Sequence, residues 1–244
     1  MDAPLPCPQC PLRPRPAFKP VSPAELAWLY QRKVGQRRCQ PGESIIQPGD
    51  TDERIYTLLS GWAFRYNTLP DGRRQILNFL LPGDLLGLQA ELNAAAPHGI
   101  EALTEVSLCA FKHSTVFRLF SDHANLAYDL TWLAAHSERL GDDVLLSVGR
   151  RTARERVAML LVHLTKRARS VGMEEGGCIP FPLTQAHLAD ALGLSPVHVN
   201  RVLQRLRRDG LIRLADGRLA IGDLRALRRV AEYWDQPAPF RPLL

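Results

Sequence analysis

The sequence predicts an α+β chain with a β-rich first half, a long helix, and a small basic domain of short helices. Three observations support this prediction. Short β-branched and aromatic runs alternate with turn residues between positions 36 and 112. Apolar residues recur at helical spacing between positions 114 and 171. Two short helices joined by a glycine-containing turn, and then a hairpin, are expected between positions 183 and 221.

The composition is that of an ordinary globular protein. The 244 residues suit one large domain or two modest ones, and 45% of them are hydrophobic and 23% charged, which excludes disordered and collagen-like chains. No apolar run reaches the roughly 18–20 residues that a membrane span needs. The first residues lack the basic and apolar segments of a signal peptide. We therefore expect a cytoplasmic protein that makes no contact with a membrane and keeps its thiols reduced.

Positive charge is concentrated near the end of the chain. The net charge is +6, but residues 150–244 hold 17 Lys and Arg against 9 Asp and Glu, whereas residues 1–149 hold 14 against 16. A basic last third on a nearly neutral body is typical of a module that binds a polyanion. Charge alone leaves nucleic acid and a membrane surface as alternatives, and the motifs below favour nucleic acid.

The first half is predicted to contain an arm, a short helix and many short strands. Residues 1–20 show no helix or strand period, and Ser22 with Pro23 can start a helix that ends near Lys33. Proline–glycine turns then recur at about ten-residue spacing. The strands expected between them cover residues 44–47, 54–59, 62–68, 75–81 and 104–112. Many short strands at this spacing indicate a sandwich or a barrel.

A long helix is predicted over residues 114–147, ending near Gly149, with a second helix over residues 152–171. One row of the long helix has the 4-3-4-3-4 spacing of a heptad seam, made of Leu126, Leu130, Leu133, Ser137, Leu140 and Val144. Either the β domain of the same chain or a second copy covers this row. The period is close to 3.5 residues over several heptads, which favours a parallel dimer.

Residues 183–206 predict a helix-turn-helix. Thr184 can cap a first helix over residues 185–192, and Gly193 can end it with left-handed backbone torsions. Ser195 can cap a second helix that starts at Pro196. Apolar residues of this second helix, Val199, Val202, Leu203 and Leu206, share one face. Two helices joined by a short glycine-containing turn form this DNA-binding motif.

The other face of the second helix carries groups that bind DNA. Arg pairs with guanine, Asn and Gln pair with adenine, and cations contact phosphates. The predicted DNA-binding residues are Thr184, Gln185, Ser195, Val197, His198, Asn200, Arg201, Gln204, Arg205 and Arg208. Residues 209–221 then form two short strands around Ala215-Asp216-Gly217, as in a wing.

With these motifs the chain resembles the CRP/FNR family of bacterial transcription regulators over nearly its whole length. The residues that carry the resemblance are Pro41-Gly42-Glu43, Gly83-Asp84-Leu85-Leu86-Gly87, Thr152-Ala153-Arg154-Glu155-Arg156-Val157 and the run from Leu188 to Arg201. The resemblance implies a double-stranded β-helix (cupin-like) sensor barrel, a dimerisation helix and a winged helix-turn-helix. It also implies a homodimer on a palindromic operator of double-stranded DNA, with half-sites about one turn apart, and RNA polymerase as a partner.

The family resemblance assigns domains to the chain. The expected parts are a cysteine-bearing arm (1–21), the sensor barrel (22–113), the dimerisation helix (114–149), the DNA-binding domain (150–235) and a loose tail (236–244). Arg201 matches the guanine-reading Arg of the family, whereas Val197 stands where the family has Glu and Asn200 replaces a Ser or Gly. Enzyme motifs such as a phosphate-binding loop or a nucleophile elbow are absent from the sequence, so we expect no enzyme.

The signal is expected at cysteines. Cyclic nucleotide is not expected, because Gly87 is followed by Leu88-Gln89-Ala90 and the phosphate-binding position reads Pro97-His98-Gly99-Ile100-Glu101. The FNR branch ligates an oxygen-labile [4Fe–4S] cluster, and Cys7, Cys10 and Cys109 match three of its ligand positions, whereas Pro16 stands at the fourth. Cys39 is a candidate for the fourth ligand, and the alternative is a three-cysteine cluster with a non-protein or oxygen ligand. The alternatives are a thiol–disulfide or zinc role for Cys7 and Cys10, a small-molecule ligand, or control by abundance.

Overall fold

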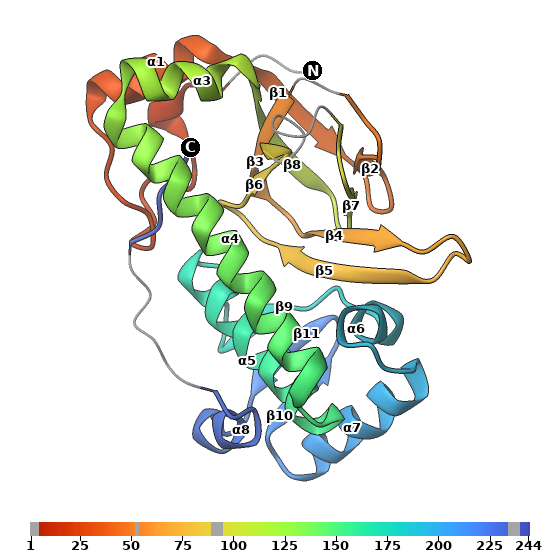
Figure 1. Cartoon of the computed structure of the whole chain (residues 1–244). Helices are drawn as coiled ribbons and strands as arrows, with labels where there is room; N and C mark the ends of the chain where they lie inside the picture. Colours follow the sequence, from red (N-terminus) through yellow and green to blue (C-terminus); the bar gives the residue numbers. More distant parts are fainter. Residues whose placement is uncertain (1–4, 52–53, 89–94, 234–239) are drawn as a thin grey trace. The chain divides into compact units, whose positions relative to one another are not determined.

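The computed structural model describes residues 5–51, 54–88, 95–233 and 240–244 (Figure 1). The chain divides into two compact units. The first comprises Met1–Asn67, Phe79–Glu138 and Pro239–Leu244, and the second comprises Thr68–Asn78 and Arg139–Ala238. The chain therefore crosses between the units several times, and its last residues return to the first unit.

Two four-stranded antiparallel sheets make up the β domain. One sheet has the order β1 (Lys33–Cys39), β8 (Val106–Lys112), β3 (Arg54–Ser60), β6 (Leu85–Leu86), and the other has the order β2 (Ser44–Ile46), β7 (Gly99–Ala102), β4 (Ala63–Thr68), β5 (Arg74–Leu80). Side chains from both sheets fill one core, which includes Tyr56, Leu58, Ala63 and Ile100. The expected barrel is thus a two-sheet β-sandwich that is not closed. The strands at 33–39, 85–86 and 99–102 were not anticipated from the sequence.

Strand β8 places its residues on two different surfaces. Successive side chains of a strand point to opposite faces of the sheet. Val106, Leu108 and Ala110 lie in the core of the sandwich. Cys109 and Phe111 therefore face the other side, where both are also buried. This second face is covered by the N-terminal arm and the end of the chain, and it carries the cysteine site described below.

The helices begin where capping residues are present. Ser22 forms a capping box with Glu25 at the start of α1 (Pro23–Arg32), and Thr152 does the same with Glu155 at the start of α5 (Ala153–Ser170). The predicted helix over 114–147 is instead two helices, α3 (Ser114–Asp122) and α4 (Ala124–Arg150), separated by His123. Helix α4 also runs through Gly149. No helix among the described residues is both long and apolar enough to traverse a lipid bilayer.

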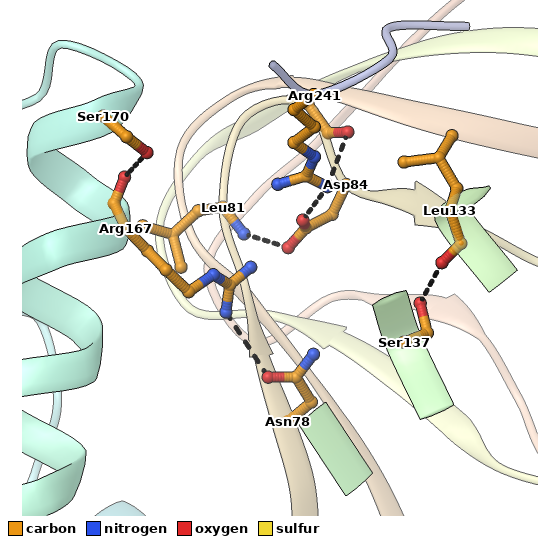
Figure 2. A network of polar contacts seen from close by, with 9 residues as sticks. Asn78, Leu81, Asp84, Leu133, Ser137, Arg167, Ser170 and Arg241 are labelled. Carbon is orange, nitrogen blue, oxygen red and sulfur yellow. Dashed lines mark hydrogen bonds and ion pairs between the residues drawn. The ribbon is translucent and has the colours of Figure 1, made fainter. Parts of the chain in front are cut away.

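Four of the six residues of the predicted seam of α4 are buried within the single chain, whereas Ser137 is exposed and Val144 is half-buried. Leu126, Leu130, Leu133 and Leu140 have between 1% and 7% of their surface exposed. The Ser137 hydroxyl donates a hydrogen bond to the backbone oxygen of Leu133, 3.0 Å away, within the same helix (Figure 2). The four leucines of this row therefore pack against their own chain, and the assignment of the whole row to a dimer interface stays a prediction. The period of a row shows that something covers it, but not which chain supplies the cover.

The opposite row of α4 is the one left open. It starts two positions later with the same 4-3-4-3-4 spacing and comprises Tyr128, Trp132, Ala135, Arg139, Asp142 and Leu146. Tyr128 is 70% exposed and Leu146 is 51% exposed. Leu145, beside this row, is 74% exposed. We call this row the open face of α4.

The second unit is a small helical domain with a three-stranded sheet. Helices α5, α6 (Gln185–Leu192) and α7 (Pro196–Arg208) precede a sheet of order β10 (Ile212–Ala215), β11 (Arg218–Ile221), β9 (Cys178–Pro180), and α8 (Leu224–Val230) follows. The β9 strand adds a third strand to the predicted two-stranded wing. The core includes Val157, Leu161, Leu188, Val199 and Leu206.

The tip of the β4–β5 hairpin groups with the second unit. Arg74 Nε lies 3.1 Å from Asp190 Oδ2 on α6, and Gln75 donates a hydrogen bond to the backbone oxygen of Ala191. Arg167 on α5 donates to Asn78 Oδ1 over 3.4 Å (Figure 2). Residues that follow a strand of the β-sandwich are therefore in direct contact with the first helix of the helix-turn-helix.

Candidate nucleic-acid interface and cysteine pocket

The helix-turn-helix is formed by the capping residues that the sequence indicates. The Thr184 hydroxyl accepts the backbone N–H of His187, and Nδ1 of His187 accepts the backbone N–H of Thr184. Burial lowers the pKa of His187, and Arg74 lowers it further, which favours the neutral imidazole that accepts this bond. Gly193 ends α6 with a φ of 62°, and the Ser195 hydroxyl accepts the backbone N–H of His198 at the start of α7. The turn between the helices is thus held at both ends.

Helix α7 has one buried and one exposed face. Val199, Val202, Leu203 and Leu206 are buried in the domain core. The opposite face is exposed and carries most of the predicted DNA-binding side chains, namely Val197, His198, Arg201, Gln204, Arg205 and Arg208. Asn200 is half-buried beside them. Arg207 is exposed on the same helix and was not included in the prediction.

The wing adds a further cation. Strands β10 and β11 pair in register from Ile212↔Ile221 to Ala215↔Arg218. Asp216 and Gly217 both have positive φ, 51° and 67°, as the tight turn between right-twisted strands requires. Arg213 is exposed on β10. A capped helix with an exposed polar and basic face, followed by a basic wing, is an arrangement that fits the major groove of DNA.

Three cysteines that are far apart in the sequence line one small pocket of the first unit. Cys7 and Cys10 come from the arm, which forms a 3-10 turn at Cys7–Gln9, and Cys109 comes from β8. The remaining lining residues are Leu5, Arg13, Leu29, Lys33, Thr57, Leu59, Phe111, Leu243 and Leu244. We call this the cysteine pocket. It brings together the three cysteines that the family resemblance selected.

The strand register explains which cysteines meet. Cys109 is paired with Gln36 on one side and Thr57 on the other, so Thr57 and Cys109 point to the same face of the sheet. Cys39 pairs with Val106, an odd number of residues from Cys109, and lies in the core of the sandwich on the opposite face. The structure therefore does not bring Cys39 to the pocket. Cys178 is half-buried on β9 in the second unit.

Burial controls the charge of the pocket. Burial raises the pKa of the Cys109 thiol to about 12, although Lys33 opposes the rise, and burial also raises the pKa of Cys7. Arg13 is partly buried next to these thiols, and its burial lowers the pKa of its guanidinium. Two nitrogens of Arg13, Nε and Nη1, are buried and have no hydrogen-bond partner among the described residues. A cation with unsatisfied donors therefore lies in the same pocket as two thiols whose pKa burial raises.

The packed pocket has little free space. Its cavity of about 20 Å³ has room for about one water molecule. Among the residues that the structure describes, no three His, Cys, Asp or Glu side chains are grouped closely enough to hold a metal ion. The pocket thus contains three cysteines that could ligate a metal group. In this conformation their thiols are not close enough together to bind one.

The arm is anchored on both sides of the cysteine pocket. Lys19 Nζ lies 2.8 Å from Oδ1 of Asp129, a buried carboxylate on α4. Lys33 Nζ donates a hydrogen bond of 2.6 Å to the backbone oxygen of Leu5. The cysteine-bearing arm is therefore connected directly to the long helix and to strand β1.

A cation that the sequence did not reveal lies near the position where the family holds a phosphate. Arg65 on β4 is paired with Ile100 on β7. Burial lowers the pKa of His98 to about 4, and the positive charge of Arg65 contributes to this shift. Only the register of β4 and β7 brings Arg65 to this stretch. Gln89 and Ala90, which contributed to the expectation about cyclic nucleotides, lie outside the described residues.

Comparison with known proteins identifies the family. The chain is 31% identical over 218 residues to the transcriptional activator protein FnrL of Cereibacter sphaeroides, an alignment that covers 88% of this chain and 87% of that protein. The chain belongs to the CRP/FNR family of transcription regulators. Residues 36–123 match the model of a cyclic nucleotide-binding domain, and residues 155–230 match the model of a Crp-like helix-turn-helix domain.

Two further similarities agree with membership of the CRP/FNR family. The nitrogen fixation regulation protein FixK of Bradyrhizobium diazoefficiens is 29% identical over 218 residues, covering 89% of this chain and 90% of that protein. The solved structure of FixK2 from Bradyrhizobium japonicum has a TM-score of 0.73 and 27% identity, and covers 80% of this chain and 96% of that chain. These relatives are regulators of transcription and not enzymes, and the helix-turn-helix is the part that binds DNA.

Proposed function

We propose that this CRP/FNR-family regulator acts in the cytoplasm as a homodimer on a palindromic operator of double-stranded DNA, and contacts RNA polymerase there. The exposed face of α7 is the observation that carries this proposal, because a capped helix bearing Arg201, Gln204 and Arg205 can enter the major groove. Phosphate contacts from Arg205 and Arg208 would position the helix, and Arg201 would read a base.

The open face of α4 supports the dimer. A two-fold contact uses the same patch on both copies. Tyr128 and Leu146 are exposed apolar residues eighteen positions apart on one side of this helix, with half-buried Trp132 between them. Pairing two such faces would bury these side chains and would set the distance between two recognition helices. The dimer proposal therefore uses this row and not the row at Leu126–Val144.

We also propose that DNA binding is controlled by an oxygen- or redox-sensitive [4Fe–4S] cluster in the cysteine pocket. Cys7, Cys10 and Cys109 would hold it through their thiolates. A bound cluster would make the site sensitive to oxygen, because the cluster would be oxidised and lost in air. The orphaned nitrogens of Arg13 fit a group of this negative charge. Cys39 is not included because its strand position faces the core, so a fourth ligand would have to come from outside these thiols.

The cluster proposal is tested by anaerobic purification of the full chain, with visible absorption and assays of iron and acid-labile sulfide before and after exposure to air. A broad charge-transfer band that bleaches in air, with matched iron and sulfide, is expected. Cys109→Ala should lose the iron, whereas Cys178→Ser should retain it. Colourless protein that still binds DNA would overturn the cluster and favour thiol oxidation, a small-molecule ligand or abundance as the signal.

The operator proposal is tested by selecting binding sites from randomised DNA with the full chain. An inverted repeat with half-sites about one helical turn apart is expected. Selection of a single, asymmetric half-site, together with a monomer in sedimentation, would overturn the proposal of a dimer.

A further inference from the structure

The end of the chain, residues 240–244, is attached to the first unit and forms part of the cysteine pocket. The sequence suggests only a loose tail here, because it is short and contains proline. In the structure the tail follows the DNA-binding unit but packs with the arm and the β-sandwich. Pro242 and Leu243 are buried, and Leu243 is only 2% exposed.

Arg241 anchors the tail through its backbone. Its N–H donates to the backbone oxygen of Ala17, and its own backbone oxygen accepts the N–H of Lys19, each over 2.8 Å. These two bonds form a parallel β-bridge with Phe18 of the arm. The tail is therefore bound as a short extra strand along the segment that carries Cys7 and Cys10 towards Lys19.

Arg241 also anchors the tail through its side chain. The guanidinium donates a hydrogen bond of 2.9 Å to the backbone oxygen of Gly83 and forms an ion pair with Asp84 (Figure 2). The side chains of Arg241 and Asp84 are 15% and 8% exposed, so the pair is largely desolvated. Asp84 also accepts the backbone N–H of Leu81 over 2.8 Å, which holds the carboxylate in place. A desolvated, hydrogen-bonded pair of this kind fixes position more firmly than a surface ion pair.

The last two residues reach the cysteines. Leu243 and Leu244 line the cysteine pocket together with Cys7, Cys10 and Cys109. The Thr57 hydroxyl donates a hydrogen bond to the backbone oxygen of Leu244. Thr57 is the cross-strand neighbour of Cys109, so this contact places Leu244 directly beside the strand position of that thiol.

We propose that residues 241–244 are an intramolecular ligand of the cysteine pocket, which shields the thiols and must leave before they react or take up a bound group. The proposal builds on the proposed function only in treating this pocket as the sensing site. With the tail in place the cavity accepts about one water molecule. A thiol reagent or a metal group therefore cannot enter the cysteine pocket while Leu243 is bound there. Each of them would have to displace the tail from this space.

The chemistry of the thiols fits this competition. Leu243 and Leu244 line the pocket beside Cys109, which is only 6% exposed, so the tail helps to keep water and reagents from this thiol. The thiolate is the reactive and ligating form of cysteine. Departure of the tail would open the space beside Cys7 and Cys109 to water and to reagents. Any group that binds only the tail-free pocket would shift the protein towards that state.

The test measures how fast the cysteines are alkylated in the reduced, metal-free full chain. Iodoacetamide labelling of Cys7 and Cys109 is followed by mass spectrometry under anaerobic conditions. Leu243→Asp places a charge in the apolar pocket, and Arg241→Met removes the ion pair. Both should raise the labelling rate at least tenfold. Phe240→Ser is the matched control, because Phe240 lies next to Arg241 but is 70% exposed.

A peptide supplied from outside tests whether the pocket recognises the tail itself. The acetylated hexapeptide of residues 239–244 is added at millimolar concentration to the Leu243→Asp chain, because a tethered segment has an effective concentration of this order. The peptide should slow labelling of Cys109 at least threefold, whereas the same peptide with aspartate in place of Leu243 should not. A circular dichroism melt identifies variants that fail to fold.

The outcomes separate this proposal from the proposed function. Equal labelling rates in folded wild type, Leu243→Asp and Phe240→Ser would overturn the tail proposal, even if the protein carries an iron–sulfur cluster. Labelling that depends on the tail would support it, even if the anaerobic protein contains no iron, because iodoacetamide needs no metal.

Discussion

Lys19 on the cysteine-bearing arm forms an ion pair with Asp129 on α4, with 2.8 Å between Nζ and Oδ1. The carboxylate side chain is 5% exposed and the lysine side chain is 43% exposed. The pair joins the segment that carries Cys7 and Cys10 to the helix whose open face we propose as the dimer contact. It is therefore a direct physical connection between the cysteine pocket and the proposed dimer.

Lys19→Met should reduce the free energy of unfolding by about 1–2 kcal/mol, because it leaves the buried Asp129 carboxylate without its partner. This expected loss is smaller than the loss for a fully buried ion pair, because the Lys19 side chain is partly exposed to water. Urea denaturation measures the change, and Lys112→Met, at an exposed position, is the control. The double variant Lys19→Met/Asp129→Leu should recover part of the loss, and a loss that is simply additive would show that the pair is not coupled.

Gly83→Ala should destabilise the first unit by about 2–5 kcal/mol. Gly83 has a φ of +90°, and an added Cβ would lie 2.5 Å from the ring of Phe18. The backbone strain contributes about 1–2 kcal/mol and the overpacking about 1–3 kcal/mol. Gly72→Ala is a matched control, because its φ is +86° but nothing lies within 4 Å of the added atom. Equal losses in urea denaturation of the two variants would contradict the close packing of Phe18.

Arg201→Ala and Arg208→Ala should weaken DNA binding in different ways. Loss of a base contact at Arg201 should cost about 1–3 kcal/mol per half-site and relax the sequence preference. Loss of a phosphate contact at Arg208 should weaken binding to all sequences evenly and flatten its dependence on salt. Fluorescence anisotropy with operator and unrelated DNA at several salt concentrations measures both. Wild-type affinity of Arg201→Ala for the operator would show that α7 is docked differently.

Leu146→Glu should weaken the dimer at least tenfold, because it places a charge on the open face of α4, where this leucine is 51% exposed. Sedimentation of the full chain measures the effect. Leu69→Glu, at a residue 52% exposed in the β4–β5 turn, should leave it unchanged. Leu130→Glu should instead unfold the protein, since Leu130 is 3% exposed within one chain. A folded, monomeric Leu130→Glu chain would return the interface to the row at Leu126–Val144.

His98 should make the protein less stable in mild acid. Its pKa is lowered to about 4 by burial and by Arg65, whereas an unfolded histidine titrates near 6.5. Between these values the unfolded chain binds more protons, so stability is complete above about pH 6.5 and falls as the pH decreases towards 4. The loss has an upper limit of about 3 kcal/mol. His98→Gln should flatten the profile measured by urea denaturation, leaving a slope of the same sign from His187.

Local signals predicted the parts of this protein that depend on nearby residues. The capping of α6 and α7 by Thr184 and Ser195, and the left-handed Gly193 between them, are visible in the sequence because each cap needs only the next few residues. The buried face of α7 was equally predictable from its helical period. Strand β7 was missed, because its four residues carry a glycine and a glutamate and gain their strand geometry from pairing with β2 and β4.

The sequence by itself determined the family, the helix-turn-helix and the residue types at the cysteine positions. Only the tertiary structure decided which residues of α4 are covered, that Cys39 faces the core while Cys7, Cys10 and Cys109 share a pocket, and that Leu243 and Leu244 line this pocket. The reason is that caps and periods arise from neighbours in sequence. The partner that covers a face comes from distant segments, and the residues on that face do not encode which segment it will be.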